Sequence, residues 1–345
     1  MRAATMRRAL PLLLIALHRA SGSSGDSGSD GDPRKSKLGS AKRDHRRCGE
    51  QQYSAMIALA EGLSAYLVSN SSNRYLAHGQ FGIFAGGAQF NARKRLPDYE
   101  GVKTRFLFSE VCSLEHAHGH GPTASSARTS TGPMPTRMGP MTICEVGFNA
   151  GLSALLLLEA ASTSRVISFD LGDMPWTRNA GAPSRPASAP RARIALPPHS
   201  ARAPLPAESF LRSRYPDRFL GVVYGDSSKT IPRYKAAHAA FTCDAAFIDG
   251  DKSYHGRRSQ LRRMRGVSYA GGRLFFDEVT AERCLDGSVP LGNHTAACQG
   301  LNGQYWPAVQ AYDKSVRDGE VRVLGCAYPE RYKDRDGICT AEFAK

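Results

Sequence analysis

Acidic side chains recur at the ends of the apolar, strand-like segments in the second half of the chain. These residues are Glu145, Asp170, Asp226, Asp249, Asp251, Asp277 and Glu278. In a sheet of parallel strands with helical crossovers, ligands bind beyond the carboxyl ends of the strands. Carboxylates gathered there can accept hydrogen bonds from hydroxyl groups or bind a hard cation. We therefore expect a ligand site at this edge of the predicted sheet.

The segment "CEVGFNAGLSALLLLEA", residues 144–160, places a glycine turn between a strand-like run and a helix-like run. Gly147 and Gly151 stand four residues apart, which differs from the GxGxxG spacing that cradles a pyrophosphate. Phe148 and Asn149 also occupy positions that a diphosphate would crowd. The turn therefore disfavours an NAD-dependent dehydrogenase.

Two further acids suit a nucleoside group bound against this turn. Asp170 follows the glycines by about twenty residues, a spacing at which an acid accepts hydrogen bonds from a ribose diol. Asp226 and Ser227, at the end of the next strand-like run, are placed to meet an adenine edge. The pattern predicts a ligand that carries these two groups.

Strand-length apolar runs alternate with helical patterns from residue 141 onward. The runs are "MTICEV", "RVISFD", "FLGVVYGD", "CDAAFID" and "GGRLFFDE", and "EVRVLGCAY" with "GICTAEF" then predicts a strand pair that closes one edge. Parallel neighbours need crossovers, so this alternation requires helices on both faces of the sheet. We predict an α/β fold with a doubly wound, Rossmann-like, seven-stranded sheet, mostly parallel with an antiparallel edge strand, preceded by an N-terminal helical extension.

The composition divides the chain into successive segments. We predict a signal peptide at 1–22, a disordered linker at 23–47, a helical extension at 48–115, a low-complexity loop at 116–140 and the α/β domain at 141–345, with a disordered insertion at 178–206. Within the extension, "QQYSAMIALAEGLSAYLVSN" has the periodicity of an amphipathic helix. The three alternating histidines that open the loop have no expected Cys or carboxylate partners, so we predict no metal site there.

From Met141 to Cys326, the chain resembles the class I S-adenosylmethionine-dependent methyltransferases. The similar motifs are "CEVGFNAG", "SFDLGD", "YGDSSKTIP", "CDAAFIDGDKSYHG" and "GGRLFFDE". The fourth is similar to the "IDGDHSY" of the methyltransferase-24-like group, with Lys252 where histidine is common. The resemblance implies that the glycine turn holds the methionine part of the cofactor, the acid after the second strand holds the ribose, and the acid after the third lies near the adenine. The implied cofactor-binding residues are Glu145, Gly147, Phe148, Asn149, Gly151, Asp170, Asp226, Ser227 and Asp249.

"FIDGDKSY" followed by "FFDE" is also similar to the catechol and caffeoyl-CoA O-methyltransferases. In those enzymes, an Asp after the fourth strand and an Asp-Asn pair after the fifth hold a divalent metal. The resemblance implies that Asp249, Asp277 and Glu278 hold Mg²⁺ or another divalent cation, and that Asp249 and Lys252 are catalytic, Lys252 as a base. Glu278 stands where Asn is usual. In the alternative interpretation, Asp277 and Glu278 only cap the fifth strand and Lys252 is a surface side chain.

The N-terminus and the eight cysteines indicate the secretory pathway or secretion, with organelle targeting as the alternative. In an oxidising lumen some cysteines should pair. We expect disulfides from the late cysteines Cys284, Cys298, Cys326 and Cys339. Cys144 and Cys243 precede apolar strand cores and are expected to be buried and unpaired. Sequons at residues 70 and 293 are compatible with glycosylation.

The formal net charge of +15 comes from three segments. Residues 1–50 carry eleven Lys or Arg against five acidic residues, and residues 178–202 and 257–265 each carry five arginines and no acid. Without interleaved aromatic residues or a nucleic-acid motif, we interpret these segments as solvated, the last as the exposed face of a helix. We expect no nucleic-acid partner and no stable membrane span after signal removal, and the oligomeric state stays open.

These patterns lead to two hypotheses of different classes. The first is an S-adenosylmethionine-dependent methyltransferase that acts on an oxygen of a small-molecule acceptor or sugar hydroxyl. The second is a secreted, non-catalytic protein that retains the same fold. The acids at the strand ends favour the enzyme, whereas the signal, the cysteines and the insertions favour the alternative. The acceptor itself is not readable from the sequence.

Overall fold

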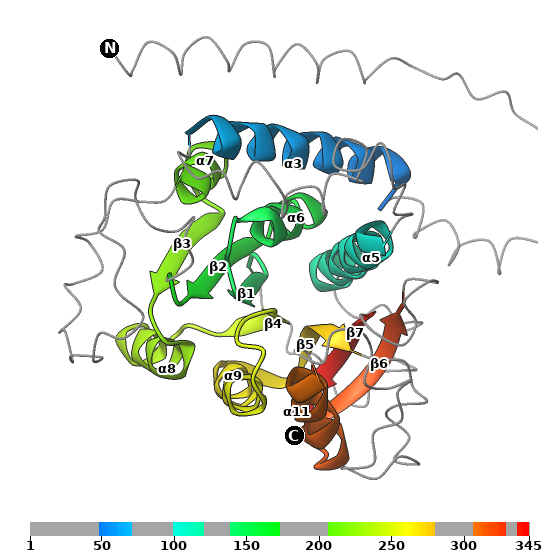
Figure 1. Cartoon of the computed structure of the whole chain (residues 1–345), viewed down its shortest axis with the longest axis vertical. Coiled ribbons are helices and arrows are strands. Elements are labelled where there is room, and N and C mark those ends of the chain that lie inside the picture. The colour runs from blue at the N-terminus through cyan, green and yellow to red at the C-terminus, as the bar shows by residue number, and fades with distance from the viewer. Residues whose placement is uncertain are drawn as a thin grey trace, which may run out of the picture.

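The computed structural model describes residues 48–70, 99–120, 139–172, 206–279, 306–328 and 337–344. These residues form a seven-stranded sheet in the order β3-β2-β1-β4-β5-β7-β6, with helices on both faces (Figure 1). The strands are β1 (Thr142–Val146), β2 (Arg165–Asp170), β3 (Phe219–Tyr224), β4 (Cys243–Ile248), β5 (Ser268–Val279), β6 (Val321–Ala327) and β7 (Gly337–Phe343). The helices are α3 (Glu50–Asn70), α5 (Tyr99–His120), α6 (Leu152–Ala160), α7 (Pro206–Arg214), α8 (Ser227–Ala237), α9 (Tyr254–Val267) and α11 (Trp306–Arg317).

The strand order places a topological switch point between β1 and β4. β1 pairs in parallel with β2 on one side and with β4 on the other. In sheets of this type ligands bind beyond the carboxyl ends of the strands at the switch point, which here are the ends of β1 and β4. β7 lies between β5 and the edge strand β6, and it pairs with both of them in the antiparallel direction. The predicted Rossmann-like fold of mostly parallel strands is confirmed.

Two apolar layers enclose the sheet. Along β1, Ile143 packs in the layer that contains α3, α5, α6 and α7, and Cys144 packs in the layer that contains α8, α9 and α11. This alternation follows from the two-residue period of a strand. Both faces of the sheet are covered, which explains the nearly continuous apolar composition of its central strands.

Helix α6 needs cover on its outer side because it is apolar almost all round. Seven of its nine residues are buried, in the segment "LSALLLLEA". A helix of this kind is stable in water only when neighbours enclose it. Helices α3 and α5 lie against α6 and supply that enclosure (Figure 1). The N-terminal helices are therefore part of the core of the domain.

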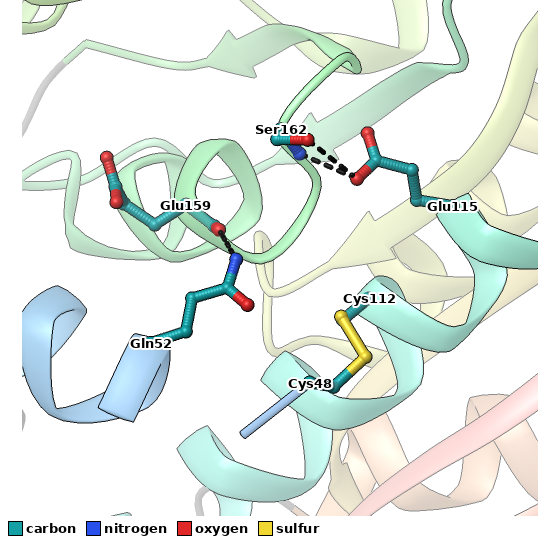
Figure 2. The surroundings of a disulfide bond; sticks show 6 residues. All are labelled: Cys48, Gln52, Cys112, Glu115, Glu159 and Ser162. Atoms are coloured by element: carbon teal, nitrogen blue, oxygen red, sulfur yellow. Dashed lines mark hydrogen bonds between the residues drawn. A yellow bond between two sulfur atoms is a disulfide. The ribbon is translucent and has the colours of Figure 1, made fainter. Parts of the chain in front are cut away.

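A disulfide bond and a hydrogen bond fasten these helices in place. Cys48, just before α3, is bonded to Cys112 of α5 (Figure 2). Gln52 of α3 donates from Nε2 to the carbonyl oxygen of Glu159, in the last turn of α6, at 3.1 Å. The disulfide and this hydrogen bond link α3 to α5 and to α6.

Glu115 of α5 caps the turn between α6 and β2. Its carboxylate oxygens accept the backbone N–H groups of Ser162 and Thr163 at 2.7 and 2.6 Å (Figure 2 draws Ser162). Burial raises the pKa of Glu115, but these hydrogen bonds outweigh burial and lower it. Helix α5 continues to His120, five residues beyond the predicted boundary at residue 115.

The prediction that Cys144 and Cys243 are unpaired is wrong. They form a disulfide between β1 and β4, with Cα atoms 5.7 Å apart, and both are fully buried. The two cysteines are 99 positions apart in the chain, and only the pairing of β1 with β4 brings them together. Cys326 and Cys339, both predicted disulfide formers, are bonded between β6 and β7.

The prediction that the arginines of α9 form a solvated face is wrong for two of them. Arg257 is fully buried and Arg258 nearly so. Arg258 lies 2.6 Å from Glu320 and 3.1 Å from Asp318, and these ion pairs tie α9 to the segment between α11 and β6. Arg262 on the same helix is exposed, as predicted.

Some predictions lie outside the described residues. They are the signal peptide and linker at 1–47, most of the loop at 116–140, the insertion up to Pro206 where α7 begins, the sequon at residue 293, and the cysteines at 284 and 298. Within the described ranges, none of the helices is long and apolar enough to span a membrane.

Candidate functional site

The glycine turn between β1 and α6 closes against the end of β4. Gly147 has a φ of +101°, and a β-carbon there would lie 2.6 Å from the backbone carbonyl oxygen of Asp249. Gly151 has a φ of +79°, and its β-carbon would lie 2.9 Å from the ring of Phe148 and 3.2 Å from Ala207. Protein atoms fill the space that the two absent side chains leave. The space beside the two glycines is therefore closed to a ligand, and the binding of the methionine part of a cofactor by the rest of the turn stays a prediction.

Phe148 and Asn149, the two central residues of the turn, have different surroundings. Phe148 is fully buried and stacks on Phe219 of β3 with ring centroids 5.9 Å apart, so it belongs to the core and is not exposed to a ligand. Asn149 is exposed, and its φ of +47° lies in the left-handed region that Asn tolerates better than most residues. Its backbone N–H donates to Oδ2 of Asp170 at 3.0 Å. The turn thus presents Asn149 toward solvent.

Glu145 is buried beneath the turn. Its two carboxylate oxygens accept hydrogen bonds from the hydroxyls of Ser153 in α6 and Ser168 in β2. Burial raises the pKa of Glu145 to about 8, the serine hydrogen bonds oppose this, and the charges of Asp170 and Asp249 add to it. Glu145 therefore braces β1 against α6 and β2, and no part of it reaches the surface for direct contact with a ligand.

Asp170 links the end of β2 to the glycine turn. Oδ2 accepts the N–H of Asn149 at 3.0 Å, and Oδ1 accepts the N–H of Gly172 at 2.6 Å. The residue is 9% exposed. Each carboxylate oxygen can accept two hydrogen bonds, so acceptor capacity remains on both oxygens for hydroxyl groups.

Asp226 is the N-cap of α8, at the end of β3. Its Oδ1 accepts the N–H of Ser228 at 2.9 Å, and its Oδ2 lies 3.5 Å from Nζ of Lys229. Burial raises the pKa of Asp226, but the hydrogen bonds from Ser228 together with the hydrogen bond and charge of Lys229 lower it overall. Asp226 is exposed, and Ser227 follows it as the first residue of the helix.

The three predicted metal ligands are connected through cations. Nζ of Lys252 contacts Oδ1 of Asp249 and lies 2.7 Å from Oε2 of Glu278. Nη2 of Arg257 lies 2.8 Å from the same oxygen of Glu278 and 3.7 Å from Asp249. The ends of β4 and β5 are therefore joined by an ionic cluster, which Asp277 completes.

Asp277 is paired with a residue from the N-terminal part of the chain. Nζ of Lys103, in α5, lies 2.7 Å from Oδ1 of Asp277, and both side chains are largely buried. Burial raises the pKa of Asp277, but Lys103 and Lys252 lower it overall. Helix α5 therefore contributes a side chain to the carboxyl edge of the sheet.

Glu278 owes its orientation to a β-bulge. The pairing of β5 with β7 shifts register between Asp277 and Val279, and Glu278 is the extra residue, with a φ of +64°. Bulges are frequent beside active sites, where they redirect a side chain. Here the bulge directs the carboxylate of Glu278 toward Lys252 and Arg257.

Lys252 does not suit the predicted role of base. Burial lowers its pKa, but the nearby carboxylates of Asp249 and Glu278 raise it more than burial and Arg257 lower it. A base must be unprotonated to accept a proton, whereas this lysine is held in its charged form. The alternative of a simple surface residue also fails, because its side chain is 32% exposed and paired with two acids.

The cluster does not fit a divalent cation. Such a cation needs several carboxylate oxygens that converge on it. Each of the three carboxylates already has a positively charged group within hydrogen-bonding distance, contributed by Lys103, Lys252 or Arg257. A bound metal would lie beside these groups and be repelled by them. We therefore route no chemical step through a metal.

His116 has cysteine neighbours that the sequence did not reveal. Cys48, Cys112 and His116 bring their ligand atoms within 4.8 Å of one another, the one such group of metal-ligand type among the described residues. The two sulfurs form a disulfide, whereas zinc binds thiolates. This group therefore supplies no metal site in the oxidised chain.

Sequence reasoning missed the cations Lys103 and Arg257 as members of the site. A usable signal was present, because each stands on the apolar stripe of its helix. Lys103 precedes Leu107 by four residues, and Arg257 precedes Leu261 by four. A charged residue on a buried stripe requires an ionic partner inside the protein, and the acids at the strand ends were the available partners.

The family comparison agrees with the fold and with the position of the site. Residues 144–279 match the family model described as a methyltransferase domain, of the methyltransferase-24 type. This stretch runs from β1 to the end of β5 and contains the glycine turn and every strand-end acid described above. The segment is thus similar to a methyltransferase domain, which agrees with the resemblance predicted from the sequence. The matched segment spans less than half of the chain. No curated protein sequence matches the chain significantly.

Several solved structures match the chain at low sequence identity and low TM-score. An O-methyltransferase from Bacillus cereus in complex with SAH is 15% identical, with 68% of this chain and 90% of that chain covered and a TM-score of 0.37. A putative caffeoyl-CoA O-methyltransferase from Staphylococcus aureus is 9% identical, with coverage of 81% and 99% and a TM-score of 0.41. A SAH-bound methyltransferase from Podospora anserina is 15% identical, with coverage of 84% and 96% and a TM-score of 0.39. At these identities and TM-scores, no residue assignment is taken from them.

Proposed function

We propose that the protein transfers the methyl group of S-adenosylmethionine to an oxygen of a small-molecule acceptor, such as a sugar or other hydroxyl compound. The observation that carries the proposal is the carboxylate of Asp170. It lies inside the segment that matches the methyltransferase family, and it is joined to the glycine turn by the N–H of Asn149. This is the position from which an acid binds a ribose in a doubly wound sheet.

The residues at the ends of β1, β2 and β3 fit such a cofactor. Asp170 keeps acceptor capacity for the ribose hydroxyls. Asp226 and Ser227 stand at the neighbouring strand end, where the adenine edge would lie. Asn149 is the exposed residue of the turn and is placed to contact the methionine part of the cofactor. Glu145 supports the turn from below through its hydrogen bonds with Ser153 and Ser168. When bound, S-adenosylmethionine supplies a methyl group already activated on a sulfonium centre.

Lys252 and Asp249 are placed to act on the acceptor. Both side chains are about one-third exposed, at the end of β4 beside the glycine turn. A protonated Lys252 can donate a hydrogen bond to the acceptor oxygen and stabilise its ionised form. Methyl transfer depends chiefly on alignment of the nucleophile with the methyl group, so this orienting role suits the reaction. In this proposal Lys252 binds and orients the acceptor oxygen, and the proton that the hydroxyl loses passes to the partly exposed carboxylate of Asp249.

Calorimetry with S-adenosylhomocysteine, the demethylated product, tests the proposal. The wild-type chain should bind it. Asp170→Asn should weaken binding at least tenfold, or about 1.4 kcal/mol, because the amide replaces an acceptor with a donor. Asp217→Asn is the matched control, since Asp217 is an exposed acid in the turn before β3 and should leave binding unchanged. Absence of binding of both S-adenosylmethionine and its product by the wild-type chain would refute the function.

The secreted, non-catalytic protein remains the second candidate. The three disulfides in the described part of the chain favour it, because such bonds persist in oxidising compartments. For the same reason we propose that the protein enters the secretory pathway. Product binding without methyl transfer to any of a panel of hydroxyl acceptors would select this candidate over the enzyme. Methyl transfer to one acceptor would exclude it.

A further inference from the structure

The acidic ends of β4 and β5 hold cations that come from three separate parts of the chain. Lys103 belongs to α5, Lys252 to the loop after β4, and Arg257 to α9. We propose that these cations occupy the place of a divalent metal, so that the site is a metal-free ionic cluster. The inference rests on the proposed function for its reaction, which would proceed without a metal.

The pairing pattern is complete for the three acids. Lys103 lies 2.7 Å from Asp277, Lys252 bridges Asp249 and Glu278, and Arg257 lies 2.8 Å from Glu278. In the described part of the chain, three positive groups thus face three carboxylates. A divalent cation added to this set would leave an excess of buried positive charge, which is costly.

Arg257 cannot easily move aside for a metal. It is fully buried, and its Nη1 donates to the carbonyl oxygen of Ile248 at 2.6 Å. Its guanidinium also stacks over the ring of Phe276, 5.0 Å from the centroid. These contacts hold the charge in place independently of the acids. A fixed guanidinium beside Glu278 therefore keeps that carboxylate unavailable to a metal.

The backbone is also adapted to this pairing. Glu278 adopts its left-handed conformation inside a bulge, a conformation that costs about 1–3 kcal/mol in a residue other than glycine. Its N–H donates to Oδ1 of Asp277 at 2.9 Å, the same oxygen that faces Lys103. Contacts within the cluster thus compensate the backbone strain at Glu278, so the backbone conformation and the ion pairs support each other.

The cluster makes helix α5 a part of the acceptor edge. Lys103 precedes Cys112 by nine residues on this helix, and the Cys48–Cys112 disulfide fixes the helix to α3 (Figure 2). The N-terminal helices therefore complete an edge that the family match alone does not contain.

A Mn²⁺ binding experiment tests whether the cationic side chains of the cluster exclude a divalent metal. The probe is Mn²⁺ alone, followed by electron paramagnetic resonance of the free ion and by calorimetry. The wild-type chain should show no specific binding up to about 1 mM, the weak end of biological divalent-cation affinities. The double variant Lys103→Met with Lys252→Met should gain Mn²⁺ affinity at least tenfold, because it uncovers Asp249 and Asp277.

Matched controls keep the test decisive. Lys314→Met with Arg322→Met also removes two positive charges, each from an exposed ion pair away from the cluster, and should gain no affinity. If the first double variant does not fold, Lys252→Met alone carries the test, because its side chain is 32% exposed. Tight Mn²⁺ binding by the wild type, an equal gain in the control, or no gain in the cluster variants overturns the inference. Product calorimetry on the same samples separates this result from failure of the proposed function.

Discussion

Gly147 and Asp249 meet across the switch point of the sheet. A β-carbon on Gly147 would lie 2.6 Å from the carbonyl oxygen of Asp249. The backbone N–H of Asp249 donates to the carbonyl oxygen of Val146, and the N–H of Gly147 donates to that of Phe169, both at 2.9 Å. The glycine turn is therefore locked to the ends of both β2 and β4. The proposed cofactor turn and the acidic cluster form one connected unit.

Gly147→Ala should disrupt this unit. The added β-carbon meets backbone atoms, which cannot yield as a flexible side chain would, and the φ of +101° adds strain. We expect a loss of about 3 kcal/mol or more in the free energy of unfolding and loss of product binding. Gly266→Ala in α9 is the control, because nothing lies within 4 Å of its β-carbon position. Urea unfolding that ranks the two variants as equal would contradict the packing role of Gly147.

Substitutions of Asp226 can distinguish its role as a helix cap from a role in ligand binding. Asn is as good an N-cap as Asp, so Asp226→Asn should keep the hydrogen bond to Ser228 and change stability by less than about 0.5 kcal/mol. Asp226→Ala should cost about 1 kcal/mol. If the carboxylate binds the adenine edge, both variants should weaken product binding in calorimetry. Unchanged binding by Asp226→Asn would assign this residue to the cap alone.

The sequence predicted the features that depend on local pattern. The runs of apolar residues located the five parallel strands, and the acids at their ends located Asp170, Asp226 and Asp249 on one edge. Strand ends in a parallel sheet share an edge whatever the details of packing. The fold and the place of the candidate site were therefore predictable without any knowledge of contacts.

The contacts that depend on register were not predictable in this way. The Cys144–Cys243 disulfide exists because β1 and β4 are neighbours, a fact that the spacing of 99 residues hides. The partner of Lys103 depends likewise on how α5 packs against the sheet, because residue types indicate only that a buried lysine needs an acid and not which acid it meets. The glycines of the turn were recognised, but the atoms that fill the space beside Gly147 come from the distant segment at Asp249.

Arg258 and Arg262 share a helix but differ in burial, which allows a matched comparison. Arg258 is 7% exposed in its side chain and pairs with Glu320 and Asp318, so Arg258→Met removes the buried cation that these two carboxylates share. We expect a loss of about 3 kcal/mol in the free energy of unfolding. Arg262 is 66% exposed, and Arg262→Met should cost less than about 0.5 kcal/mol. Denaturant titration of both variants checks this, and equal losses would contradict the buried network.

The three described disulfides should differ in how readily they are reduced. Cys144 and Cys243 are both fully buried in the sheet, whereas Cys48 and Cys326 are partly exposed. Exchange requires access of the attacking thiolate to a sulfur. Mild reduction followed by alkylation and mass spectrometry should therefore modify the Cys48–Cys112 and Cys326–Cys339 pairs first. Early modification of Cys144 would contradict the burial of this bond.

Loss of the Cys48–Cys112 bond should weaken the whole domain. The bond closes a loop of 64 residues. A cross-link of this span lowers the entropy of the unfolded chain, which stabilises the folded state by about 4 kcal/mol. The double variant Cys48→Ser with Cys112→Ser should lose about 2–4 kcal/mol in the free energy of unfolding, because the measured effect of a disulfide is often smaller than its loop-entropy value. Reductant should then have less further effect on this variant than on the wild type. Equal sensitivity of the two proteins would show that this bond is not the one that reductant opens first.

Glu145 gives the fold a specific dependence on pH. Its pKa is about 8 in the folded chain, raised by burial, against an ordinary value of 4.5 in the unfolded chain. Between these values the folded form keeps a proton that the unfolded form releases. This group therefore makes stability fall as pH rises, by about 1.4 kcal/mol per pH unit across that window, with no further change above it.

Glu145→Gln should remove this dependence, because the amide keeps the size of the side chain and does not ionise. Near pH 5 the two proteins should have similar free energies of unfolding, and toward pH 8 the variant should become progressively more stable than the wild type. Urea unfolding at several pH values within this range measures the difference, in which the titration of all other groups largely cancels. Parallel curves for the two proteins would mean that Glu145 is already ionised in the folded state, stabilised by the hydroxyls of Ser153 and Ser168 despite its burial.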